Sequence, residues 1–159
     1  MASIRRELVL EARLIDVWAA VRDVGALHER LVPGFVVGTR LENGARIVTF
    51  ANGLVARELI VDIDDDARRL VWAVVGSPRL THHNASVQIF DAGEGRSRFV
   101  WIADLLPDAA AGDIGMLIDR ALAVIEQTLE FRLDSASRGR CDRASGAHEL
   151  WDMAWRGGL

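Results

Sequence analysis

The sequence predicts an α+β fold in which a curved, seven-stranded antiparallel sheet wraps around one long C-terminal helix. Short strand-like stretches separated by turn residues fill most of residues 35–106. A single amphipathic helix pattern then runs from about residue 110 to residue 134. Because one helix cannot fill the concave side of a strongly curved sheet, this order of elements also predicts an internal ligand cavity.

The N-terminal part is expected to supply the first strand and two short helices. Residues 4–12 are predicted to form the opening strand, and Asp16 is placed to cap a short helix. Gly25 interrupts that helix before a second helical turn at residues 27–31, which a Pro-Gly pair ends.

Six further strands are predicted, each bounded by turn residues. Asn43-Gly44 and Asn52-Gly53 are typical of the tight turns between antiparallel strands. The acidic run at residues 64–66 is expected to form a solvated turn. The predicted strands are residues 35–41, 45–50, 54–64, 70–75, 81–90 and 98–106.

The C-terminal helix is expected to complete one domain, residues 1–134. Its apolar face consists of Ile114, Leu117, Ile118, Ala121, Leu122, Ile125 and Leu129. Residues 135–159 are predicted as a flexible tail that carries a short amphipathic segment with Trp151 and Trp155. We expect this segment to dock on its own domain, on the partner subunit of a homodimer, or over a cavity mouth.

Composition excludes several classes of function. The net charge of −4 and the pI near 5.5 argue against a nucleic-acid or anionic-membrane partner. No apolar run is long enough for a membrane span and no signal-peptide core is visible, so a cytoplasmic location is expected. The single cysteine excludes a disulfide framework within the chain.

Several kinds of chemistry are excluded as well. Lysine and tyrosine do not occur, which removes Schiff-base lysines, lysine bases and phenolic acids. The sequence contains no phosphate-binding glycine loop, no nucleophile elbow and no spacing of His, Cys or carboxylates typical of zinc. We therefore expect neither a metal nor a cofactor.

The turn at residues 51–53 fixes the pairing of the two strands beside it. If Phe50 faces Leu54, then Arg46 faces Glu58 on the same side of the sheet. On the convex side this ion pair would be surface decoration, whereas in the concavity it would be a desolvated pair suited to ligand recognition. Alternation along the strand does not decide between the two sides.

One histidine and two tryptophans are further candidates for the cavity wall. His82 and His83 are adjacent in a strand and face opposite sides, with His83 on the apolar side. His83 is either a core residue held by hydrogen bonds or a titrating group available near neutral pH. Trp72 and Trp101 lie on apolar strand faces, where core packing and pocket lining use the same residues.

Several short stretches between about residues 4 and 133 share their order and spacing with a known family. They are Val17-Trp18, Arg46, Arg57-Glu58-Leu59, Arg69-Leu70-Val71-Trp72, Arg79-Leu80-Thr81-His82-His83 and Leu105-Leu106-Pro107. In this order they resemble the START/Bet v 1-like helix-grip superfamily, in its polyketide cyclase/dehydrase-like branch. The resemblance implies a helix-grip fold around a cavity for a hydrophobic small molecule.

Two loops are similar to those of another branch, the plant abscisic-acid receptors. Asn52-Gly53-Leu54 resembles a shortened gate loop, and Gly76-Ser77-Pro78-Arg79-Leu80 resembles the latch loop. This resemblance implies that Glu58 and His83 face the cavity, with Arg46 as a partner there. The receptors' ligand-anchoring lysine has no counterpart here, and neither does the lysine of plant helix-grip enzymes that make benzylisoquinolines. A hormone-receptor function is therefore not implied.

Three functions remain after this comparison. The first is binding of a hydrophobic small molecule such as a polyketide, lipid or isoprenoid. The second is a cyclase/aromatase or dehydratase in which Glu58 and His83 move protons. The third is a non-catalytic interaction module that docks through its tail. The expected ligand-binding residues are Arg46, Leu54, Glu58, Trp72, Val74, Arg79, Leu80, His83, Trp101, Leu117 and Ala121.

Overall fold

The computed structural model describes residues 1–138, with side chains for residues 1–130. Seven strands form one antiparallel sheet in the order β1-β7-β6-β5-β4-β3-β2. Helices α1 and α2 follow β1, and the long helix α3 follows β7, as predicted. The elements are β1 (Ala2–Leu10), α1 (Leu14–Arg22), α2 (Leu27–Arg30), β2 (Val36–Glu42), β3 (Ala45–Phe50), β4 (Val55–Asp64), β5 (Arg69–Val75), β6 (His82–Gly93), β7 (Arg96–Leu106), a 3₁₀ turn (Asp108–Ala110) and α3 (Ala111–Arg138).

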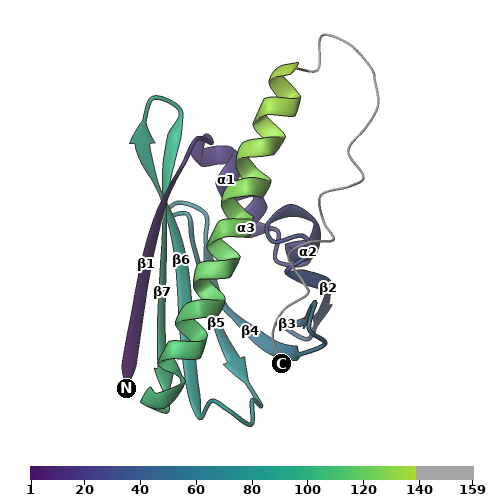
Figure 1. The fold of residues 1–159 in the computed structure, drawn as a ribbon, viewed down its shortest axis with the longest axis vertical. Coiled ribbons are helices and arrows are strands. Elements are labelled where there is room, and N and C mark those ends of the chain that lie inside the picture. Colours follow the sequence, from purple (N-terminus) through teal and green to yellow (C-terminus); the bar gives the residue numbers. More distant parts are fainter. Residues whose placement is uncertain (139–159) are drawn as a thin grey trace, which may run out of the picture.

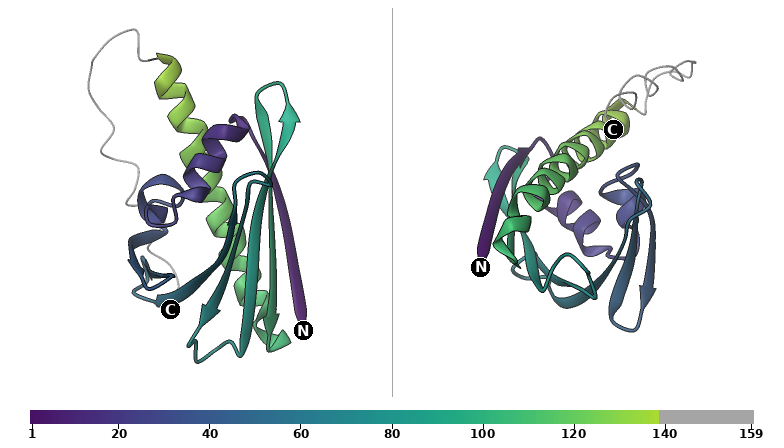
Figure 2. Two further views of the ribbon diagram at one scale, coloured as in Figure 1. Left: turned by 180° about the vertical axis from the view of Figure 1, so that it is seen from behind. Right: turned by 60° about the horizontal axis from the view of Figure 1, so that its bottom comes forward.

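The sheet is strongly curved, and α3 crosses its concave side (Figure 1). In the right-hand view of Figure 2, β1 lies beside α3 and the sheet bends round to β2 and β3 on the opposite side. Register shifts between Val36 and Gly38 and between Ile60 and Asp62 mark irregularities that bend β2 and β4. Among the described residues, no helix combines the length and apolar character needed to cross a membrane.

The predicted strands agree with the observed ones to within three residues. The largest difference is at the hairpin between β6 and β7, where both strands continue closer to the turn than expected. Gly93, Glu94 and Gly95 all have positive φ angles, of 77°, 54° and 75°. These left-handed conformations let the chain reverse in a very short turn, which leaves the flanking residues free to pair.

Two helix boundaries correct the predictions. Asp16 does not cap α1, because the helix already begins at Leu14 and has Arg13 at its N-cap. The Asp16 carboxylate instead accepts hydrogen bonds of 2.7 and 3.1 Å from the Arg13 guanidinium. At the other end of the chain, α3 continues to Arg138, beyond the predicted end at residue 134. The rest of the predicted tail, with its amphipathic segment, lies outside the described residues.

The acidic turn after β4 has a role that the sequence did not predict. Asp65 accepts a hydrogen bond of 3.0 Å from the Trp18 indole and bonds of 2.6 and 3.0 Å from the Arg22 guanidinium. The Arg22 hydrogen bond, assisted by that of Trp18, lowers the pKa of the Asp65 carboxyl group. This turn therefore holds α1 against the end of the sheet rather than only facing solvent.

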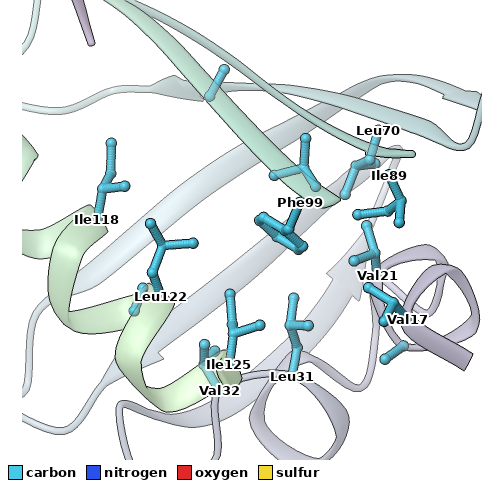
Figure 3. Packing of buried hydrophobic residues seen from close by; sticks show 14 of the residues in the cluster. Val17, Val21, Leu31, Val32, Leu70, Ile89, Phe99, Ile118, Leu122 and Ile125 are labelled. Atoms are coloured by element: carbon cyan, nitrogen blue, oxygen red, sulfur yellow. The ribbon is translucent and has the colours of Figure 1, made fainter. Parts of the chain in front are cut away.

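The densely packed core lies where α1 and α2 meet the sheet. Figure 3 shows Val17 and Val21 of α1 near Phe99 of β7, with Ile125 of α3 on the other side. Leu10, Val17, Phe99 and Ile125 have no exposed surface. A hydrogen-bonded ion pair of 2.6 Å between Arg6 of β1 and Asp119 then fixes α3 along the first strand. Helix α3 thus closes one part of the concavity.

Candidate functional site

A cavity of about 2220 Å³ lies between the concave face of the sheet, α3 and the chain from α2 to β3. Its walls are mainly apolar. All of the residues predicted to bind a ligand line this one space, and their role in binding remains a prediction. They are Arg46, Leu54, Glu58, Trp72, Val74, Arg79, Leu80, His83, Trp101, Leu117 and Ala121.

The cavity wall beside Trp72 has one short side chain, on the long helix. Ala121 lines the cavity from α3, and its methyl group adds little volume there. Trp72 of β5 lies opposite Ala85 of β6, which in turn lies opposite Ala103 of β7. These two alanines belong to the buried core and do not line the cavity.

Three buried polar side chains lie in one row across the cavity wall. Arg46 of β3 is opposite Glu58 of β4, and Glu58 is opposite Val74 of β5. The backbone N–H of Val74 then donates to the imidazole of His83 on β6. The exposed fractions of Arg46, Glu58 and His83 are 4%, 8% and 9%. Among the residues with described side chains, the other buried polar one is Ser97, which donates a 2.9 Å hydrogen bond to the Ala12 carbonyl.

Arg46 and Glu58 form a buried ion pair on the concave side of the sheet, the side implied by the family resemblance. Arg46 Nε donates to Glu58 Oε2 at 2.6 Å. The guanidinium also lies over the Trp72 ring, 5.4 Å from its centre, which is a favourable cation–π position. Within the described part of the chain, its two terminal nitrogens have no hydrogen-bond partner. Arg46 is therefore fixed on one edge and available to a ligand on the other.

His83 occupies a place where the ladder between β5 and β6 has ended. The last paired residues are Trp72 and Ala85, and the next N–H, that of Val74, donates to His83 Nδ1 at 3.3 Å. Burial, assisted by His82, lowers the pKa of His83 and outweighs the attraction of Glu58, which raises it. The imidazole is therefore neutral near pH 7, and its proton is on Nε2.

Aromatic rings form two further parts of the wall. Trp72 and Trp101 meet edge to face with ring centres 5.5 Å apart. Phe35 and Phe50 form a second edge-to-face pair with ring centres 5.6 Å apart, and this pair was not predicted. Phe50 shares its strand face with Arg46, so the period of two could have identified it. Phe35 precedes β2, and no pattern in the sequence indicates its position.

The two loops that resemble a gate and a latch both lie at the cavity. In the latch-like loop, Arg79 reaches Asp113 in the first turn of α3 at 3.2 Å. Their side chains are 71% and 60% exposed, so the ion pair contributes at most about 1 kcal/mol. Leu54 in the gate-like turn is 47% exposed. No cluster of three His, Cys, Asp or Glu side chains suited to a metal occurs in the described residues.

A family model described as "Polyketide cyclase / dehydrase and lipid transport" matches residues 1–134. No curated protein matches the chain. A protein from Thermobifida fusca is 27% identical, with a TM-score of 0.69 over 83% of this chain and 93% of that one.

Two more distant solved structures show the same fold. One is a START superfamily protein from Mycobacterium smegmatis, 10% identical, with a TM-score of 0.65 over 84% of this chain and 98% of its own. The other is the di-domain ARO/CYC BexL from the BE-7585A biosynthetic pathway, 15% identical, with a TM-score of 0.67. That match covers 86% of this chain and 48% of BexL.

Proposed function

We propose, from the premise that this chain belongs to the polyketide cyclase/dehydrase and lipid-transport family, that its cavity binds a hydrophobic small molecule. Polyketides, lipids and isoprenoids are the classes that suit an apolar space of about 2220 Å³. The observation that carries the proposal is the place of the buried polar side chains. Three of them line this cavity. An apolar molecule with a few oxygen atoms would contact the apolar walls with its carbon atoms and these polar side chains with its oxygens.

The energetics of the buried ion pair favour a ligand-binding role over a purely structural one. A buried ion pair often stabilises a fold no better than apolar residues of the same size. Arg46 also keeps N–H donors on its two terminal nitrogens for which no described residue supplies an acceptor. A ligand oxygen that accepts these hydrogen bonds would account for both features.

A matched pair of alanines on α3 tests ligand binding. Ala121 is 4% exposed and lines the cavity, whereas Ala123 is exposed and does not line it. Ala121→Phe should weaken binding of bulky apolar ligands at least about tenfold, because the ring takes up space in the cavity, equivalent to about 1.4 kcal/mol. Ala123→Phe should leave the affinity unchanged. Native mass spectrometry and thermal-shift titration with a panel of aromatic and aliphatic ligands measure both.

Two results would contradict the binding proposal. One is a wild-type protein that is isolated empty and shows no thermal shift with any member of the panel. The other is equal affinity of the Ala121→Phe and Ala123→Phe variants for the bulkiest ligands.

A second candidate function is cyclisation or dehydration of a poly-β-carbonyl chain. The neutral imidazole of His83 beside Glu58 favours it, because such a pair can take and return a proton at a carbon between two carbonyls. Arg46 would polarise the carbonyl oxygen. Incubation with a poly-β-ketothioester mimic should then yield a cyclised product. His83→Ala should lower turnover by about 10²-fold or more, and unchanged turnover would remove His83 from the mechanism.

A further inference from the structure

The buried part of the cavity is already balanced in charge before a ligand enters. Arg46 and Glu58 carry opposite charges 2.6 Å apart, and His83 is neutral. The other charged residues that line the cavity lie outside this buried row. Arg79 and Asp113 pair with each other and are largely exposed, and the rest are exposed or half-buried, namely Glu11, Glu29, Arg57, Arg120 and Glu130. A ligand group that reaches Arg46 therefore meets a neutral ion pair and not a free cation.

The same row of residues nevertheless offers several hydrogen-bond donors. Arg46 uses Nε for Glu58, which leaves the N–H groups of its two terminal nitrogens. His83 uses Nδ1 as an acceptor from Val74, so its Nε2–H is available. Glu58 accepts from Arg46 through Oε2 and retains Oε1 as an acceptor. The row is thus built for oxygen atoms that accept hydrogen bonds.

We infer that the cavity selects ligands with an uncharged oxygen at Arg46, such as a ketone, enol or ester, over the corresponding carboxylates, and that Glu58 sets this selectivity. The inference rests on the proposed ligand-binding function. A ligand carboxylate would place a second negative charge beside Glu58, in a site where Arg46 is already neutralised. Burial of an uncompensated charge is strongly unfavourable. A carbonyl oxygen accepts the same hydrogen bonds and adds no charge.

Isosteric ligand pairs measure this selectivity. 2-Acetylanthracene and anthracene-2-carboxylate differ by a methyl group in place of an oxygen anion, and 2-tridecanone and dodecanoate differ in the same way. At pH 7.5 the wild-type protein should bind each ketone at least about tenfold more tightly than its carboxylate, because the charge is not compensated. Quenching of tryptophan fluorescence can report both titrations, since Trp72 and Trp101 line the cavity.

Glu58→Gln tests the cause of the selectivity. Glutamine keeps an oxygen that can accept from Arg46 Nε, but it removes the negative charge, so Arg46 becomes a free cation for the ligand. The carboxylates should then gain at least about tenfold in affinity relative to the ketones. Glu94→Gln is the matched control. Glu94 is 86% exposed in the turn between β6 and β7, neither it nor its partner Arg96 lines the cavity, and the variant has the same change in net charge. It should keep the wild-type preference.

The outcomes separate this inference from the proposal on which it rests. Wild-type protein that binds carboxylates as tightly as ketones overturns the inference and leaves hydrophobic ligand binding in place. A preference for ketones that persists in Glu58→Gln also overturns it, because Glu58 would not be its source. The wild-type comparison stands even if the Glu58→Gln variant does not fold. Wild-type protein that binds none of the four compounds and no other ligand of the panel contradicts the proposed function itself, and the inference with it.

Discussion

Arg46→Met should lower the free energy of unfolding by about 3–5 kcal/mol. The substitution keeps an unbranched apolar side chain over Trp72 but removes the guanidinium that pairs with Glu58. Glu58 is 8% exposed, so its carboxylate would remain almost buried without a positive partner. Urea denaturation of the purified protein, followed by circular dichroism and extrapolated to water, measures the change.

Two further variants show whether the loss comes from the unpaired charge. The double variant Arg46→Met/Glu58→Met should recover most of the lost stability, because two apolar side chains need no partner. Arg40→Met breaks an exposed pair with Glu42 on β2, where the side chains are 73% and 44% exposed. It should change the stability by no more than about 0.5 kcal/mol. A double variant as unstable as Arg46→Met would show that the carboxylate is not the cause.

Leu10→Ala should lower the free energy of unfolding by about 2–5 kcal/mol. Leu10 has no exposed surface and belongs to the packed end of the sheet. The neighbouring side chains there cannot all move to fill the space that the substitution leaves, so a cavity remains. The same denaturant measurement applies, and the slope of the transition should stay unchanged if both proteins unfold in one step.

Leu54→Ala is the comparison at the other end of the molecule. Leu54 lines the cavity and is 47% exposed, so its truncation leaves no new enclosed space. The loss should be no more than about 0.5 kcal/mol. Equal losses for Leu10→Ala and Leu54→Ala would contradict the division of the concave side into a packed end and an open cavity.

Most of the fold could be predicted because the patterns that define it are local. Turn residues separate the strands, and the apolar spacing of α3 extends over many turns. The predictions failed where a contact with another side chain overrides, or cannot be read from, the preference of the residue itself. Asp16 is a good capping residue by type, but its carboxylate binds Arg13, and the helix begins at Leu14. The partners of Asp65 are more than forty residues away along the chain, and no local pattern indicates them.

The row of Arg46, Glu58 and His83 shows which parts of the site strand-pairing rules can predict. The tight turn after β3 was enough to predict that Arg46 faces Glu58. It could not decide which side of the sheet they occupy, because apolar residues lie on both sides of β4. Ile60 is half-buried on the concave side, while Leu59 is 36% exposed on the convex side. The position of His83 beside Val74 depends on where the β5–β6 ladder ends, which is a property of the curved sheet.

The exposed turn between β3 and β4 has a consequence for how this site can evolve. Side chains alternate along a strand, so a slip of one residue between β3 and β4 would turn Glu58 to the convex side and bring Arg57 or Leu59 opposite Arg46. One exchange brings two positive charges together, and the other leaves Arg46 unpaired. Substitutions in the turn leave the register unaltered, although Gly53, with a φ of 84°, does not readily accept another residue. An insertion or deletion that alters the register removes the ion pair without changing either residue. Selection on the buried pair is therefore also selection on the length of this surface loop.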